Sequence, residues 1–538
     1  MAGIRKHFRW VSLAAILGVG GWLLLAPEFV ADVEEEAEEA SEAASGGRAD
    51  GGYVIRFSPG QAYMPDSVPY DIGAPLQGLK QVIRAFEARV PDTRIEVVNT
   101  PGVREYLVTQ LSSGNAPEIV NVNVEDVWID VQKGWYVPLD RFLEAPNAFV
   151  REQGDPEAPG YAAWWDMFAY QAISRGKAAP DNKNYCITFD MIETGVFYNK
   201  RIFREVGIAP PETWDQWMRD MEKLRGAGYI PMLVSIDSLN GWGTDLIFDQ
   251  LYYELLPGID LYQDPVREAY LEGYLDWDEI CFLFQQGFFG QKDPRYREVW
   301  RVMYAFRQHC NQNLSGTDFI REFVTQQGAM FWGTSPLTFR LSADRNLGFE
   351  WGVFYPPRFT KATSPYASGV EMCVIGGSAT QLEVTNSAID DTDPTLPMDE
   401  RIAQSKKLER VIAFLQFLTV RENYERIVLE YPCFVPNIVG VPVLPPLQPF
   451  AEILERRYAT AKWLGTFDLR FSEIQRRMLE LYLNDGIDLD GFMEWQVSNL
   501  EAATRNLLIR KDIDLDRLQR SWEALAPARS GPAWETAP

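Results

Sequence analysis

Residues 194–228, TGVFYNKRIFREVGIAPPETWDQWMRDMEKLRGAG, form the stretch that most constrains the fold of this 538-residue chain. A β-prone run ends at an Asn-Lys pair, a short amphipathic segment follows, and two prolines precede a segment led by tryptophan. Thr213 is a favourable N-cap for that last segment, and Gly226 or Gly228 is suited to end it. The stretch therefore predicts a strand, a short helix, a proline connector and a longer helix, in that order.

The same alternation of strand and helix opens the body of the chain. Residues 53–60, 93–100 and 116–123 predict strands, and residues 75–92 and 103–114 predict the helices between them. Apolar residues recur at helical spacing in the first of these helices. Strands that alternate with helices form a parallel sheet covered by helices, so the sequence predicts an α/β fold.

Length and charge limit the architecture and the partners. A chain of this length exceeds the size at which one hydrophobic core stops growing, so at least two lobes are expected. Its formal charge is −25 and its isoelectric point is about 4.6. Nucleic acid and anionic membranes would be repelled by most of such a surface, which excludes both as partners of the folded body.

Histidine and cysteine are too scarce or too scattered for the common metal and catalytic sites. The two histidines are His7, near the N-terminus, and His309, which we assign to an ordinary helix, so a histidine metal site or a Ser-His-acid triad has little basis. The five cysteines form no CxxC pair, and their odd number leaves at least one unpaired within the chain. We predict no metal, no cofactor and, for most cysteines, a place in the core.

The N-terminus has the pattern of an export signal. Basic residues precede a charge-free apolar run at residues 10–26, and acidic residues follow it, which places the body outside the cytoplasm. The run is long for the core of a signal peptide and short for a membrane span, so residues 1–31 are either a cleaved signal peptide or a retained anchor. Residues 32–52, rich in Glu, Ala, Ser and Gly, predict an acidic disordered linker.

Later segments predict more helix than strand. Residues 145–185 predict an irregular excursion with one aromatic helix, AAWWDMFAYQAI. Residues 246–328 predict mostly helix, and residues 407–431 predict a single amphipathic helix that ends at Pro432. The short runs GAMFWGTS, GFEWGVFYPP and SGVEMCVIGGSA predict strands.

These landmarks resemble the extracytoplasmic solute-binding proteins of ABC importers, specifically the carbohydrate-binding group that includes maltose-binding protein. GVFYNKRIFREVGIAPPETWDQW is similar to that family's strand, Tyr-Asn-Lys turn, short helix, proline connector and helix. Further resemblances follow in order in LSSGNAPEIVNVN, GWYVPLDRFL, GAMFWGTS, SGVEMCVIGGSA and IAFLQFLTVRENYERIVLEYPCFVPN. Each motif alone is weak, but the ordered set is specific and covers about residues 53–515.

The resemblance implies a periplasmic-binding-protein type II-like fold, in which two α/β lobes are joined by hinge strands with a ligand cleft between them. Residues 53–193 and 369–440 would form the N-terminal lobe, residues 194–368 and 441–515 the C-terminal lobe, and residues 516–538 a C-terminal tail. The chain is longer than usual for the family, and its first strand lacks the tryptophan often found there. These departures leave the class of solute in doubt.

Candidate ligand contacts stand at the carboxyl ends of strands and at the two crossings between the lobes, where open α/β sheets bind ligands. A sugar needs aromatic platforms and hydrogen-bonding side chains, and Trp242 and Trp332 are the candidate platforms. Trp332 matches the family's stacking tryptophan; strand packing is its alternative role. For the remaining candidates, helix capping or a solvated hinge side chain is the alternative. These remaining candidates are Ser58, Tyr63, Asn123, Glu125, Asp126, Glu193, Thr194, Ser368, Gly369 and Glu371.

The resemblance implies capture rather than catalysis. We expect a monomeric, extracytoplasmic protein that captures a sugar or oligosaccharide by cleft closure and delivers it to ABC permease subunits, touching the membrane only through its N-terminal segment. Two alternatives stay open. The same fold presents bound solute to a membrane receptor in a sensor, and a secreted carbohydrate-active enzyme would place two carboxylates across an aromatic cleft.

Overall fold

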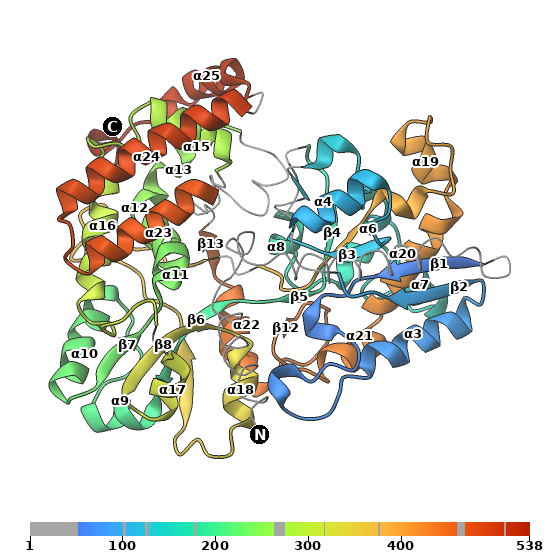
Figure 1. Cartoon of the computed structure of the whole chain (residues 1–538), viewed down its shortest axis with the longest axis horizontal. Coiled ribbons are helices and arrows are strands. Elements are labelled where there is room, and N and C mark those ends of the chain that lie inside the picture. The colour runs from blue at the N-terminus through green and yellow to red at the C-terminus, as the bar shows by residue number, and fades with distance from the viewer. Residues whose placement is uncertain are drawn as a thin grey trace, which may run out of the picture.

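The computed structural model describes residues 52–538 except 101–103, 124–126, 129, 177–178, 180, 263–274, 317, 375–376, 460–468 and 511–512. The expected export signal and most of the linker, as well as Glu125 and Asp126, lie outside the described residues. Two α/β lobes lie side by side, and strands cross from one to the other between them (Figure 1). The predicted two-lobed, type II-like fold is confirmed.

A five-stranded sheet forms the centre of the N-terminal lobe, in the order β2-β1-β3-β11-β4. Strand β1 pairs in parallel with β2 and β3, as the sequence predicts, whereas β11 pairs antiparallel with β3 and β4. The antiparallel strand belongs to the segment that returns after the chain has built most of the other lobe. The strands are β1 (Tyr53–Phe57), β2 (Thr93–Val97), β3 (Ile119–Asn121), β4 (Cys186–Thr188) and β11 (Gln381–Val384).

Helices cover this sheet and bury its apolar core. The predicted apolar stripe of α3 is buried, and Phe86 packs against Phe414 and Phe417 of the late helix α20. The helices are α3 (Gly78–Arg89), α4 (Arg104–Ser113), α6 (Asp140–Leu143), α7 (Ala148–Gln153), α8 (Gln171–Gly176), α19 (Met398–Gln404), α20 (Lys406–Thr419) and α21 (Arg421–Val428).

Two helices expected to be continuous are interrupted. The predicted helix at residues 407–431 is split into α20 and α21, because Val420 is extended and the Asn423 side chain donates to the Phe417 carbonyl. The predicted aromatic helix is split into a 3-10 turn (Trp164–Met167) and α8, because the Ala169 amide instead donates to the Asn437 carbonyl at 2.7 Å. At the first break the partner is six residues away, and at the second it is distant in sequence; in both places it takes a hydrogen-bonding group that a continuous helix would use.

The C-terminal lobe is built on a four-stranded sheet in the order β7-β8-β6-β9. Strand β6 pairs antiparallel with β8 and β9, and β7 pairs in parallel with β8. Strand β6 leads into α9 and α10, so the order predicted for residues 194–228 is confirmed, and the Thr213 hydroxyl caps α10 at Gln216 N. These elements are β6 (Thr194–Asn199), α9 (Lys200–Val206), α10 (Trp214–Gly226), β7 (Ile230–Leu233), β8 (Gly328–Thr334) and β9 (Trp351–Phe354).

Alternate residues of β8 face opposite layers of helices, as in any strand. Phe331 contacts Phe319 and Phe323 of α17 (Phe319–Val324), with ring centroids 5.8 and 4.7 Å away. Met330 points the other way, where its sulfur accepts from Trp217 Nε1 of α10 at 3.4 Å. Trp332 shares the Met330 face, so α17 and Trp332 lie on opposite sides of the sheet.

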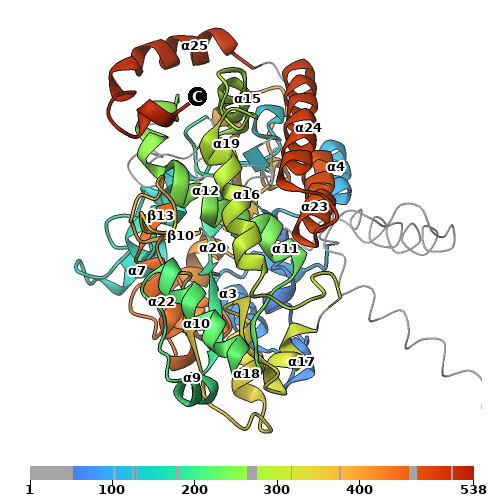
Figure 2. The same ribbon diagram turned by 90° about the vertical axis from the view of Figure 1, so that its left-hand side faces the viewer.

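Helices make up most of the rest of this lobe, as predicted for residues 246–328 (Figure 2). α23 and α24 form a long pair against the lobe, and α22 covers the sheet near β9. The elements are α11 (Ile236–Ser238), α12 (Thr244–Tyr252), α13 (Leu256–Ile259), α15 (Trp277–Gln285), α16 (Pro294–Arg307), α18 (Leu337–Ala343), α22 (Gln448–Leu454), α23 (Leu469–Leu483) and α24 (Leu489–Arg510).

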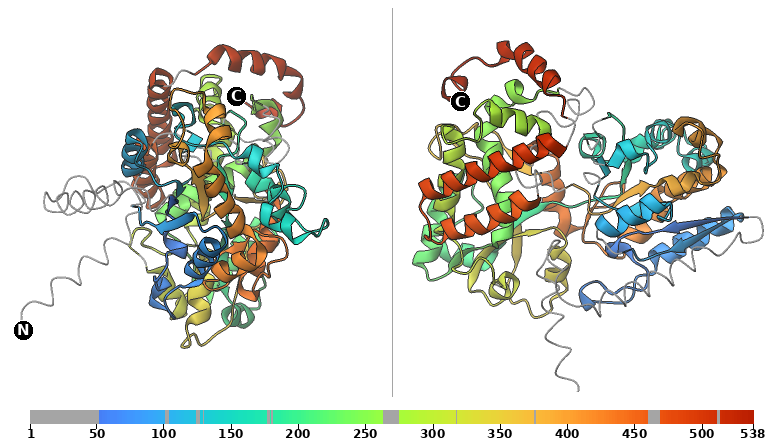
Figure 3. Two further views of the ribbon diagram at one scale, coloured as in Figure 1. Left: turned by 90° about the vertical axis from the view of Figure 1, so that its right-hand side faces the viewer. Right: turned by 45° about the horizontal axis from the view of Figure 1, so that its top comes forward.

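Residues 516–538, expected as a tail, are packed on the C-terminal lobe. They include most of α25 (Leu515–Ala524), which lies over α15 at the edge of the lobe (Figure 3). Leu518 is fully buried against Phe282. The segment is therefore part of the folded lobe.

The first two of the three connections between the lobes run next to each other. Strand β5 (Asp190–Met191) precedes β6 and pairs antiparallel with β12 (Val435–Pro436). The Ile192 amide of the first crossing donates to Gly377 of the second at 2.8 Å. Just before the second crossing, β10 (Met372–Val374) pairs in parallel with β13 (Arg457–Ala459).

Within the described ranges, no helix is both long and apolar enough to cross a membrane.

Candidate functional site

The two candidate platforms, Trp242 and Trp332, lie against each other in the C-terminal lobe. Trp332 is in β8, and Trp242 is in a π-helical turn (Leu239–Gly243) that follows β7. Their ring centroids are 6.1 Å apart with an interplanar angle of 48°. The turn is widened because Thr244 donates both its amide and its hydroxyl to the Leu239 carbonyl. The fold thus brings together two aromatic rings that are far apart in the sequence.

The indole N–H group of Trp332 distinguishes it from a fully hydrogen-bonded core tryptophan. It is only 2% exposed, yet no described residue accepts a hydrogen bond from its Nε1–H. Burying an N–H group without an acceptor costs about 1–3 kcal/mol, and the Nε1–H of Trp300 in the core of the same lobe shares this feature. The hydroxyl of Ser335, just beyond the end of β8, is also fully buried without a described partner.

Glu193 and Thr194, at the first crossing, lie at the same end of β8 as Trp332. The Thr194 amide donates to Glu193 Oε1 at 2.7 Å, and the Ser335 amide donates to the Glu193 carbonyl at 3.0 Å. Both side chains are buried, so neither is the solvated hinge side chain that the sequence left as an alternative. Their position beside β8 keeps them among the candidate contacts.

The candidates of the N-terminal lobe have structural partners. Tyr63 is buried, and its hydroxyl donates to Asp190 Oδ2 at 3.0 Å. Ser58 is also buried and shares a 2.6 Å hydrogen bond with Thr100. Asn123 is exposed beyond β3, where it accepts from Gln381 at 3.4 Å. Of these, Asn123 is the most accessible to a solute.

Ser368, Gly369 and Glu371 are anchored elsewhere, on the side of α12. The Ser368 amide donates to the Gln250 carbonyl at 3.2 Å, and the Gln250 side chain donates to the Val370 carbonyl. Gly369 has a φ of 77°, a region that favours glycine, and Glu371 is exposed. No described contact joins these three residues to Trp242 or Trp332.

Sequence reasoning missed the buried acid Asp190, which stands in β5 at the first crossing. Its carboxylate accepts from the Thr380 amide and hydroxyl, both at 2.8 Å, from the Ala379 amide at 3.0 Å and from Tyr63. Burial raises the pKa of Asp190 to about 6. A lone acid inside the β-prone run CITFDMI was the available signal. Asp190 ties both crossings to the N-terminal lobe.

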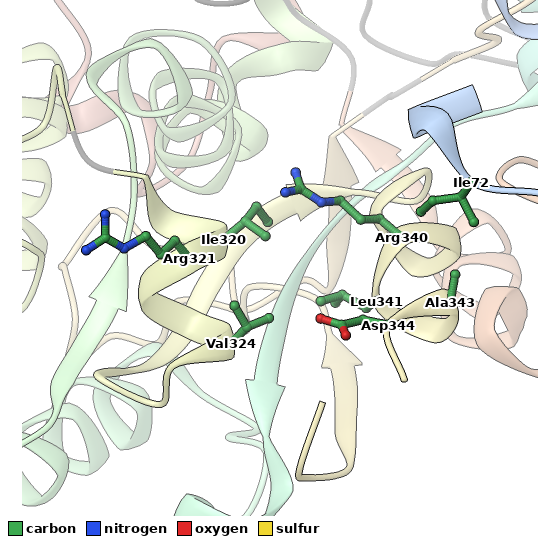
Figure 4. Close-up of a pocket in the computed structure, with 8 residues that line it drawn as sticks. All are labelled: Ile72, Ile320, Arg321, Val324, Arg340, Leu341, Ala343 and Asp344. Atoms are coloured by element: carbon green, nitrogen blue, oxygen red, sulfur yellow. The ribbon is translucent and has the colours of Figure 1, made fainter. Parts of the chain in front are cut away.

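A crevice lies at the boundary between the lobes, on the other side of the sheet from Trp332. This crevice of about 360 Å³ is formed by α17 and α18 with one residue of the N-terminal lobe, Ile72 (Figure 4). Arg340 of α18 and Asp344 just beyond its end line the crevice, but no aromatic ring does, so it lacks the platform that a sugar needs. It is lined by Ile72, Ile320, Arg321, Val324, Arg340, Leu341, Ala343 and Asp344.

Comparisons with known proteins agree with the fold. Residues 72–267 match the family model described as bacterial extracellular solute-binding protein. A multiple sugar-binding protein of Streptococcus mutans is 23% identical over 164 residues, which are 30% of this chain and 34% of that protein. The match thus spans about a third of the relative's length.

Solved structures extend the similarity of fold to most of the chain. RafE of Streptococcus pneumoniae, in its apo form, has a TM-score of 0.55 at 18% identity and aligns with 85% of this chain and 100% of its own. The sugar-binding protein MalE of Xanthomonas citri has a TM-score of 0.54 at 14% identity, with the same coverage. Another structure of RafE holds raffinose. The chain thus resembles the bacterial extracellular solute-binding proteins in sequence over residues 72–267, and it has the two-lobed fold of their sugar-binding members.

Proposed function

We propose that this protein binds a sugar or oligosaccharide outside the cytoplasm and delivers it unchanged to an ABC permease. The observation that carries the proposal is the Trp242–Trp332 pair, with a buried indole N–H that has no described acceptor. The half-buried ring of Trp242 matches the apolar C–H face of a pyranose, and the buried ring of Trp332 supports it from the strand behind. The resemblance to sugar-binding proteins supports the same solute class.

Capture without chemistry suits two lobes joined by adjacent crossings. The lobes need only rotate about these crossings to enclose a solute, and the solute must favour the closed form by a few kcal/mol. Micromolar affinity requires only about −8 kcal/mol in total. We infer that the protein is monomeric and that residues 10–26 either anchor it to the outer face of the cytoplasmic membrane or are removed on export.

A thermal-shift screen of the purified protein tests the solute class. The probes are raffinose, maltose and a chitin oligosaccharide, with leucine and spermidine as probes of other classes. A ligand that binds only the native state raises the melting temperature. We expect at least one sugar to do so. A shift with leucine or spermidine and with no sugar would contradict the proposal.

Tryptophan variants test the position of the site. Trp242→Ala and Trp332→Ala are each expected to weaken sugar binding by at least tenfold in calorimetric titration, because each removes a platform. Trp135→Ala, a half-buried tryptophan of the N-terminal lobe, is the matched control and should retain the affinity. If both Trp242→Ala and Trp332→Ala bind sugar as the wild type does, the site lies elsewhere.

A further inference from the structure

A buried chain of amide side chains connects the C-terminal helices to the turn that carries Trp242. Gln496 of α24 donates from Nε2 to Gln475 Oε1 of α23, and Gln475 Nε2 donates to Asn240 Oδ1 at 3.0 Å. Gln475 and Gln496 are fully buried, and Asn240 is 8% exposed. Amide side chains buried to this degree are held in one orientation by their hydrogen bonds.

The hydrogen bonds between these three amides determine which end of the Asn240 side chain is available. An amide presents its oxygen and its NH₂ group in different directions. Because Gln475 donates to Asn240 Oδ1, Asn240 Nδ2 must point elsewhere. Within the part of the chain that the structure describes, no residue accepts a hydrogen bond from Asn240 Nδ2. The result is an oriented donor on a side chain that is more than nine-tenths buried.

Asn240 belongs to the same π-helical turn as Trp242, two positions before it. Such turns insert an extra residue into a helix and are frequent at functional sites. The second N–H donor without a described acceptor, Trp332 Nε1, is on the ring that packs against Trp242. The Asn240 donor and the Trp332 donor therefore belong to the two elements that carry the aromatic pair.

We propose that Asn240 is a ligand-contact residue, which donates from Nδ2 to an oxygen atom of the bound sugar, and that Gln475 and Gln496 are positioning residues that fix its orientation. The inference rests on the proposed function and deepens it, because it requires a solute with an acceptor oxygen next to an apolar ring face. Hydroxyl and ring oxygens of a pyranose have this arrangement. The C-terminal helices α23 and α24 then contribute to recognition as well as to folding.

Asn240→Asp is the sharpest test, because the carboxylate still accepts from Gln475 but has no N–H to donate. Raffinose, maltose and a chitin oligosaccharide are titrated calorimetrically into the wild type and the variant. For any probe that binds the wild type, we expect affinity to fall about tenfold or more, since one hydrogen bond is lost and an oxygen faces an oxygen. Asn346→Asp, on an exposed loop of the same lobe, is the matched control and should bind as the wild type does.

Gln475→Met separates a positioning role from a purely structural one. It keeps the size of the side chain but cannot orient Asn240, so we expect weaker sugar binding together with a lower melting temperature. A residue with only a structural role would lower the melting temperature and leave the affinity of the folded protein unchanged. That result, with Asn240→Asp unchanged as well, would overturn the inference.

The failures of the two proposals are distinguishable. If Trp332→Ala weakens binding but Asn240→Asp does not, the inference is wrong and the proposed function stands. If leucine or spermidine binds the wild type and none of the three sugars does, both are wrong.

Discussion

At the scale of single residues, Asp190 shows how a charged group is used to join the two lobes. Its two oxygens together accept from Tyr63, Ala379 and Thr380, so the first crossing, the second crossing and the N-terminal lobe meet at one carboxyl group. Burial opposes ionisation more strongly than these donors favour it, and the pKa of Asp190 is raised to about 6. The site therefore couples the stability of the crossings to pH.

The raised pKa of Asp190 predicts that the free energy of unfolding falls as the pH rises. Its pKa is higher in the folded chain than the ordinary value of 3.8, so the folded state binds this proton more tightly than the unfolded state. The protonated carboxyl contributes about 3 kcal/mol to the free energy of unfolding. This contribution is complete below about pH 4 and is lost as the pH rises towards about 6. Urea unfolding between pH 3.5 and 7 measures it.

Two variants of Asp190 provide the controls. Asn at this position still accepts from the Ala379 and Thr380 amides and can donate to the hydroxyls of Tyr63 and Thr380. Asp190→Asn should therefore fold and reduce the pH dependence by this amount. Asp190→Ala leaves the buried amides without an acceptor and should lose about 1–3 kcal/mol at every pH. An unchanged pH profile in Asp190→Asn would contradict this role for Asp190.

At the scale of elements, local signals define helix ends more reliably than helix continuity. The Thr213 hydroxyl accepts from Gln216 N at 3.3 Å and begins α10 at the predicted place, because capping involves neighbours in the chain. The helix predicted at residues 407–431 is broken at Val420 by hydrogen bonds that involve Asn423. Apolar residues recur with similar periodicity on both sides of Val420, so the periodicity could not predict the break.

The cap of α10 gives a prediction at this scale. Thr213→Ala should lower the free energy of unfolding by about 1 kcal/mol, because the Gln216 amide loses its acceptor at the helix end. Chemical denaturation measures the change. Thr213→Ser keeps a hydroxyl in the same position and should lose only a fraction of this. Equal losses in both variants would show that the methyl group of Thr213, rather than the cap, is responsible.

At the scale of the whole molecule, the C-terminal segment completes the second lobe. Arg295 is 1% exposed at the start of α16, where its guanidinium donates to the Ala533 carbonyl at 2.6 Å and to the Thr536 carbonyl at 3.1 Å. The ring of Trp534 contacts the backbone near Gly258, where any larger residue would collide with it. The last residues of the chain are thus fixed to elements formed much earlier in the sequence.

Arg295→Met tests this attachment. The variant keeps an apolar stem but removes both hydrogen bonds. We therefore expect the free energy needed to detach the C-terminal segment from the lobe to fall by about 2–4 kcal/mol. Hydrogen exchange of the amides in α25 should accelerate, while exchange in the N-terminal lobe stays the same. Arg345→Met, an exposed arginine of the same lobe, should change neither. Unchanged protection of α25 in Arg295→Met would contradict the attachment.

The sequence alone determined the alternation of strands and helices, the order of elements from Thr194 to Gly228 and the buried stripe of α3. These depend on periodicity and capping, which act between residues a few positions apart. The resemblance of ordered motifs also indicated the two lobes and Trp332, and a glycine-flanked loop after a strand indicated Trp242. The sequence could not determine how close the two tryptophan rings would lie, or which of the other candidate residues would lie next to them.

The tertiary structure alone decided that Trp242 packs on Trp332, that Asn240 bonds to Gln475 and that Asp190 joins both crossings. Each of these contacts links segments separated by 90 residues or more of the printed sequence. Such contacts form only when sheets and helices have packed, since no local preference holds the groups near each other in the unfolded chain. For this protein, local patterns therefore specify the elements, and long-range packing specifies the candidate site.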